Sequence, residues 1–231
     1  MTITLLLILG IFLGAGGGVL FYKKSQVADQ ICLVGIGFLI MICFDDIFPL
    51  VYQKNIPHIG IFVIFGILLQ VLLEYITKGF EHKTSENIQE KKSSKISLGI
   101  ITGLSLHAFI EGIPLSGTKN LSDPYLWGIL VHNFPISFLM GTLWAQNKKK
   151  SAFFLVMIVL FSIATPLGII LGSYIDTEKQ PYFLAIVAGI FIHLCSAVLF
   201  DSHHGEQKKK LSQILYIFFG MILACVSHFF H

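Results

Sequence analysis

Eight runs of about 20 mostly apolar residues, separated by short polar links, dominate this sequence and limit what it can fold into. An α-helix needs about 20 such residues to cross the hydrocarbon core of a bilayer. The runs lie at about 2–22, 30–51, 58–78, 96–116, 125–145, 152–173, 182–201 and 211–230. Only 13% of the residues are charged, against about 25% in soluble proteins. We therefore predict an all-α integral membrane protein with eight transmembrane helices, and exclude soluble enzymes, nucleic-acid binders and disordered proteins.

The basic residues are all lysines, and they gather on alternate links between the runs. If the N-terminus lies outside, 13 of the 16 lysines are cytoplasmic, and only Lys54, Lys119 and Lys179 are external. Lysine and arginine are enriched on the cytoplasmic side of membrane proteins. We therefore predict that both termini lie outside and that the longest link, about 79–95, is a cytoplasmic loop. Residues 1–231 would form one multi-pass domain in a cell membrane, either a plasma membrane or a bacterial cytoplasmic membrane.

A few ionisable side chains fall inside the apolar runs, where each costs about 2.5–3.5 kcal/mol to insert and therefore suggests a function. His107 and Glu111 are four residues apart in the fourth run and share one helix face, and His132 lies in the fifth run. Two imidazoles and a carboxylate suit Zn²⁺ and neighbouring divalent ions, and leave a position open for exchange. A buried histidine–glutamate hydrogen bond that holds helices together is the alternative interpretation.

Both of these runs contain a proline three residues after a candidate ligand, Pro114 after Glu111 and Pro135 after His132. Because proline cannot donate a backbone hydrogen bond, we expect kinked helices in which the carbonyls of Ile110 and Val131 are free. Such irregular backbone is tolerated at membrane depth where it lines a cavity.

Further candidates are weaker. Asp46 in the second run precedes Pro49 and is a candidate for the path of an ion, and Glu74 lies near the cytoplasmic end of its run. His193 lies in a stripe of small residues, which fits a packing seam as well as a ligand. The four cysteines are scattered singly, so they indicate neither a disulfide framework nor a thiolate metal site.

Five fragments in order resemble the ZIP family of zinc and iron-regulated divalent-metal transporters, over nearly the whole chain. The similarity is greatest to the branch with H-S-x-x-E-G in span four and a single histidine in span five. The fragments are Asp-Ile-Phe-Pro at 46–49, Leu-Glu-Tyr-Ile-Thr at 73–77, His-Ala-Phe-Ile-Glu-Gly-Ile-Pro-Leu at 107–115, His-Asn-Phe-Pro-Ile-Ser-Phe-Leu-Met-Gly at 132–141 and Ala-Thr-Pro-Leu-Gly at 164–168.

The resemblance implies an eight-helix fold in which helices 1–3 and 6–8 are inverted repeats around Pro-kinked helices 4 and 5. It implies transport of a divalent ion, zinc foremost, toward the cytosol by alternating access. His107, Glu111 and His132 would be the central ligands, with Asp46 near the path. The ion is a substrate and no cofactor is expected. The expected partners are this ion and the lipid bilayer, without nucleic acid, and a homodimer is kept as an option.

The sequence departs from the family pattern at a second metal position. Ala108, Ile136 and Thr165 stand where many members have an asparagine, an acidic residue and a glutamate. We therefore expect a mononuclear site with Asn133 as no more than an auxiliary ligand.

In span seven, His193 replaces an aromatic residue and Val198 replaces a glutamate, so His193 is a candidate substitute ligand. Two alternatives remain open. One is a membrane-embedded metal-dependent hydrolase, since three ligands plus water also describe catalytic zinc. The other is a degenerate family member that binds or senses metal without transporting it.

Overall fold

The structure of the protein is a computed structural model that describes residues 2–23, 25–53, 56–77, 98–118, 120–146, 151–201 and 207–229. Within these ranges it contains helices and no strand. The elements are α1 (Thr2–Phe21), α2 (Ser25–Ile42), the π-helical turn η1 (Cys43–Ile47), α3 (Phe48–Gln53), α4 (Ile59–Thr77), α5 (Leu98–Gly112), the 3₁₀ turn η2 (Pro114–Gly117), α6 (Pro124–Gln146), α7 (Ser151–Ser173), α8 (Gln180–Asp201) and α9 (Gln207–Phe229).

In the described part of the chain, each of the eight predicted apolar runs coincides mainly with helix, and α2, η1 and α3 form one helical segment. In the described part of the chain, four helices are long and apolar enough to cross a membrane, at Thr2–Phe21, Gln26–Gln53, Pro124–Gln146 and Ser151–Ser173. Shorter apolar helices cover Ile59–Tyr75, Gln180–Ser196 and Leu211–Val226. The all-helical prediction is confirmed, whereas the number of crossings, the sidedness of the termini and the inverted repeat stay predictions.

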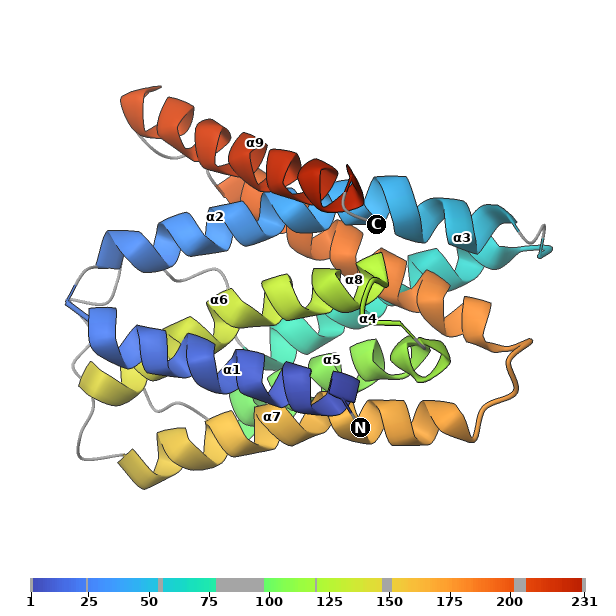
Figure 1. The fold of residues 1–231 in the computed structure, drawn as a ribbon, viewed down its shortest axis with the longest axis horizontal. Coiled ribbons are helices and arrows are strands. Elements are labelled where there is room, and N and C mark those ends of the chain that lie inside the picture. Colours follow the sequence, from blue (N-terminus) through green and yellow to red (C-terminus); the bar gives the residue numbers. More distant parts are fainter. Residues whose placement is uncertain are drawn as a thin grey trace.

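The helices form an elongated bundle in which most of them run roughly along its long axis (Figure 1). The principal helix pairs are α1 with α6, α2 with α9, α4 with α8 and α5 with α7. Helix α6 also packs against α2, and α4 against α5. The predicted cytoplasmic loop at 79–95 lies outside the described residues.

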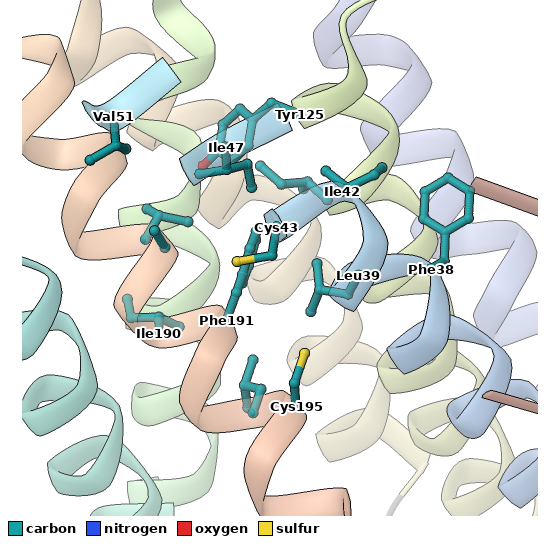
Figure 2. Close-up of a cluster of buried hydrophobic side chains, with 14 of the residues drawn as sticks. Phe38, Leu39, Ile42, Cys43, Ile47, Val51, Tyr125, Ile190, Phe191 and Cys195 are labelled. Atoms are coloured by element: carbon teal, nitrogen blue, oxygen red, sulfur yellow. The ribbon is translucent and has the colours of Figure 1, made fainter. Parts of the chain in front are cut away.

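Large apolar side chains cover the outside of the bundle as well as its interior. Leu68 is 61% exposed, and Tyr75 and Leu215 are also highly exposed. A water-soluble protein would not tolerate so many exposed apolar residues, but lipid tails solvate them well. The interior cluster of Figure 2 joins α2 and η1 to α8 through Leu39, Cys43, Phe191 and other buried residues.

Helices α5 and α7 approach each other closely at two facing glycines. A β-carbon added to Gly168 would overlap the backbone oxygen of Phe109 and lie 2.9 Å from the α-carbon of Gly112. Small residues at helix interfaces allow this backbone contact in membrane proteins. The contact fixes the end of α5 beside α7, one residue after Glu111.

Candidate metal site

Two helices supply the three side chains at the centre of the bundle. His107 and Glu111 are one turn apart on α5, so the helix itself sets their separation. His132 comes from α6, which begins at Pro124 just after the capping residue Asp123. The Asp123 carboxylate accepts hydrogen bonds from the Tyr125 backbone N–H (2.9 Å) and the Thr118 hydroxyl (2.8 Å). This cap, with proline at the first helical position, fixes where α6 begins.

The three side chains converge on one point, and they are buried. Glu111 Oε1 lies 2.9 Å from His107 Nε2 and 3.9 Å from His132 Nε2, and the two Nε2 atoms are 3.4 Å apart. The exposed fractions are 1% for His107, 0% for Glu111 and 8% for His132. Among the described residues, these three form the one group of histidine, cysteine and acidic side chains that could hold a metal ion together.

The three distances have the right size for one ion. They define a triangle whose circumscribed circle has a radius of about 2.0 Å, the length of a Zn²⁺–nitrogen or Zn²⁺–oxygen bond. A cation near the centre of this triangle would therefore reach all three atoms at bonding distance. A three-ligand site also leaves a coordination position open, as exchange of the ion requires.

The Glu111 carboxylate is poorly satisfied by the protein alone. Neither of its oxygens makes a hydrogen bond of good geometry in the described part of the chain, although Oε1 lies 2.9 Å from His107 Nε2. A buried carboxylate without such partners is costly. A bound cation would offset this cost, so the donor set is compatible with a divalent ion.

The end of α5 differs from the sequence prediction. The Ile110 carbonyl is not free, because it accepts a 3.2 Å hydrogen bond from the Ile113 N–H in a tightened last turn. The Glu111 carbonyl instead accepts a 2.8 Å hydrogen bond from the Tyr125 hydroxyl of α6. Helix α5 ends at Gly112 and η2 follows, so Pro114 terminates the helix rather than kinking it. In contrast, Pro135 lies inside α6, which continues to Gln146.

Side chains of two further helices surround the ligands. Gln70 of α4 is 3% exposed, and its Oε1 lies 3.0 Å from His107 Nδ1. Phe191 of α8 packs its ring 5.9 Å from the His132 ring, centroid to centroid. Gln70 therefore contacts His107 through the ring nitrogen that faces away from the triad, and Phe191 packs beside His132.

The positions where many family members hold a second metal are apolar here. Ala108 and Ile136 are buried within one cluster that also contains Leu104, Met140 and Phe161. Thr165 is fully buried, and its hydroxyl lacks a hydrogen-bond partner among the described residues. Of these three residues, only Thr165 has a polar side-chain atom, and none carries a charge.

The structure does not bring the auxiliary candidates into the triad. Asp46 lies half-buried in η1, beside the exposed Asp45. His193 of α8 pairs with Glu74 of α4 instead, with 2.8 Å between Nε2 and Oε2. Asn133 follows His132 and is buried, and its side-chain nitrogen and oxygen have no hydrogen-bond partner in the described ranges.

Sequence reasoning missed Gln70 and Tyr125. Both are uncharged, so a search for ionisable residues inside apolar runs passes over them. For Gln70 a signal exists, because it is an amide in the middle of an apolar run, one helical turn before Glu74. For Tyr125 no signal exists, because only the fold shows that its hydroxyl reaches α5.

Comparison with known proteins places this geometry in context. The family described as ZIP Zinc transporter matches residues 77–228, which is more than half of the chain. The chain is also similar to "Zinc transporter ZIP1" of Danio rerio, with 28% identity over 138 residues, covering 55% of this chain and 45% of that relative. The match thus spans less than half the length of that relative. No solved structure matches the chain.

Proposed function

Since the chain belongs to the ZIP family, whose members are multi-pass membrane transporters rather than enzymes, we propose that it carries a divalent transition-metal ion across the membrane. The observation that carries this proposal is the buried triangle of His107, Glu111 and His132, whose three ligand atoms lie within 4.8 Å of one another. Zinc is the foremost substrate, and transport runs toward the cytosol by alternating access.

The proposed site holds one ion. Its only charged ligand is Glu111, so two neutral imidazoles and one carboxylate leave a bound divalent ion with a net positive charge. The apolar surroundings of Ala108 and Ile136 support a mononuclear rather than a binuclear site. The open coordination position keeps a water molecule or accepts a ligand on the exit side, so that the ion can be released.

Three other residues are proposed to act along the path. Asp46 in η1 would attract the ion, and Asn133 would offer its amide oxygen beside His132. His193 would receive the ion together with Glu74, with which it pairs in the structure. This pair is partly exposed, at 18% for the histidine side chain and 27% for the glutamate side chain.

Two alternatives were open from the sequence. Membership of a transporter family excludes the membrane-embedded hydrolase. The second alternative, a family member that binds or senses metal without moving it, differs from our proposal in a measurable way. A sensor saturates with one ion per site, whereas a carrier continues to accumulate the ion inside a vesicle.

The test is zinc uptake into proteoliposomes of known protein orientation, read by an enclosed fluorescent indicator. We expect saturable uptake by the wild-type protein. Glu111→Gln keeps the shape of the side chain but removes its charge and a ligand oxygen, and His107→Ala removes a nitrogen ligand. We expect both variants to lose uptake and zinc binding. A panel of Mn²⁺, Fe²⁺ and Cd²⁺ would define selectivity, since imidazole and carboxylate ligands overlap in preference.

The matched control is Glu178→Gln, which makes the same chemical change in the exposed link between α7 and α8. We expect it to leave uptake unchanged. If the Glu111→Gln and His107→Ala variants both took up zinc at the wild-type rate, the proposed site would be wrong. Stoichiometric zinc binding without any accumulation would overturn transport in favour of sensing.

A further inference from the structure

Gln70 is an amide buried among the apolar side chains of α4, where a polar group is costly without a partner. Its side chain is 3% exposed, and Leu73, three residues further along α4, is also buried. Its Oε1 lies 3.0 Å from Nδ1 of His107, which belongs to a different helix, α5. The contact therefore joins α4 directly to one of the three proposed ligands.

The structure places the amide oxygen of Gln70 opposite His107 Nδ1. An oxygen of this kind can only accept, so this arrangement corresponds to the His107 tautomer with its proton on Nδ1. A neutral imidazole carries one proton, so in this tautomer Nε2 carries the lone pair with which a histidine binds a metal. Nε2 is the atom that lies 2.9 Å from Glu111 and 3.4 Å from His132.

Resting on the proposed function, we propose that Gln70 is a positioning residue that holds His107 in the tautomer and ring orientation required to bind the ion. Histidine ligands commonly donate their other N–H to a carbonyl or carboxylate, which fixes the ring and tunes its strength as a ligand. Here the acceptor is a neutral amide. It orients the ring without adding a negative charge next to a site that must also release its ion.

The first variant is Gln70→Leu, which removes the acceptor and keeps a buried side chain of similar length. Loss of an outer partner of a histidine ligand commonly weakens metal affinity by about 10–100-fold. We expect the KM for zinc uptake to rise by this factor. We also expect Co²⁺, used as a spectroscopic probe on the purified protein, to bind more weakly and with an altered visible absorption band.

The second variant is Gln70→Glu, which retains an acceptor but makes it anionic. A carboxylate acceptor increases the basicity of the imidazole. We expect the KM to fall and the maximal rate to fall with it, because the ion binds more tightly and leaves more slowly. A residue with a merely structural role would not move KM in opposite directions in the two variants.

The control for the loss of a buried hydrogen bond is Thr142→Val. The Thr142 hydroxyl donates to the carbonyls of Gly18 (3.3 Å) and Phe138 (3.0 Å), away from the triad. We expect Thr142→Val to lower thermal stability while KM and the Co²⁺ band remain at wild-type values.

The failure of this inference is distinguishable from that of the proposed function. If the wild-type protein takes up zinc and His107→Ala abolishes uptake, but Gln70→Leu and Gln70→Glu both leave KM and the Co²⁺ band unchanged, Gln70 has no positioning role. If the wild-type protein neither binds Co²⁺ nor takes up zinc, the proposed function itself fails, and this inference with it. If Gln70→Leu does not fold, Gln70→Glu alone tests the positioning role: a lower KM supports that role, and an unchanged KM contradicts it.

Discussion

At the scale of single residues, Glu111 is linked to α6 through its backbone, while its side chain lies in the candidate site. The Tyr125 hydroxyl donates to the Glu111 carbonyl at 2.8 Å, and both residues are buried. This bond satisfies a carbonyl that the end of α5 would otherwise leave without a helical partner. The hydroxyl thereby holds the ligand-bearing turn of α5 against the first turn of α6.

Tyr125→Phe removes this hydroxyl and leaves the rest of the ring. We expect a loss of stability of about 1–3 kcal/mol, because a buried carbonyl loses its partner. Thermal unfolding of the purified protein in detergent measures this loss. Tyr174→Phe, at an 83% exposed tyrosine, is the matched control and should have no effect. An unchanged melting temperature for Tyr125→Phe would show that the hydrogen bond contributes nothing.

The residue scale is also where the sequence is most informative and where its limits appear. His107 and Glu111 can be paired from the sequence because the α-helical period places residues four apart on one face. His132 is distant along the chain, so only its chemistry and its position in an apolar run suggest that it joins them. Gln70 is 37 residues from its partner and carries no charge, and its role depends on how α4 packs against α5.

At the scale of helices, the contact of α5 with α7 depends on the absence of side chains. Gly168→Ala would place a β-carbon against the Phe109 carbonyl, and backbone atoms cannot move aside as a flexible side chain can. We expect a loss of about 1–3 kcal/mol from overpacking. We also expect weaker zinc binding, since the displaced turn of α5 carries Glu111. Unfolding and zinc titration together measure these effects.

Gly16→Ala in α1 is the control, because nothing lies within 4 Å of the position that its β-carbon would occupy. Alanine favours a helix over glycine by about 1 kcal/mol, so this variant should be neutral or slightly more stable. If Gly168→Ala were as stable as Gly16→Ala, the backbone contact between α5 and α7 would not be a tight one.

Helices α4 and α8 are joined by a contact between Glu74 Oε2 and His193 Nε2, which are 2.8 Å apart. A double-mutant cycle with Glu74→Gln and His193→Phe should give a coupling of about 0.5–3 kcal/mol in the free energy of unfolding, because the two groups are in direct contact. Additive effects of the two substitutions would mean that the pair does not stabilise the helix interface. Zinc uptake by the same variants tests whether the pair also receives the ion.

At the scale of the whole molecule, the lysine distribution predicts which side of the membrane each link faces. Lys179 lies in the exposed link between α7 and α8 and is expected outside, whereas Lys91 belongs to the predicted cytoplasmic loop. In a variant without the four native cysteines, Lys179→Cys should react with a membrane-impermeant maleimide applied to intact cells, and Lys91→Cys only after permeabilisation. The opposite labelling would reverse the predicted orientation.

The architecture could largely be anticipated because a bilayer allows few solutions: apolar runs of spanning length become helices. The ends of the helices were harder to predict. The fourth apolar run predicts a helix to about residue 116, but α5 ends at Gly112 and a 3₁₀ turn follows from Pro114. The π-helical turn that carries Asp46, at Cys43–Ile47, has no sequence signature beyond the nearby Pro49.

The three proposed ligands are divided between two helices, so one pair of them has a fixed separation and the third can move relative to that pair. His107 and Glu111 both belong to α5, so their separation is fixed by the pitch of a helix. His132 belongs to α6. Helix α5 packs chiefly against α7 and α4 rather than against α6, so this third distance is less constrained. Metal–ligand bonds tolerate deviations of only about 0.2 Å. A displacement of α6 relative to α5 of no more than a bond length would therefore leave the ion with two protein ligands instead of three. We therefore expect the spacing between α5 and α6 to determine how long an ion stays bound.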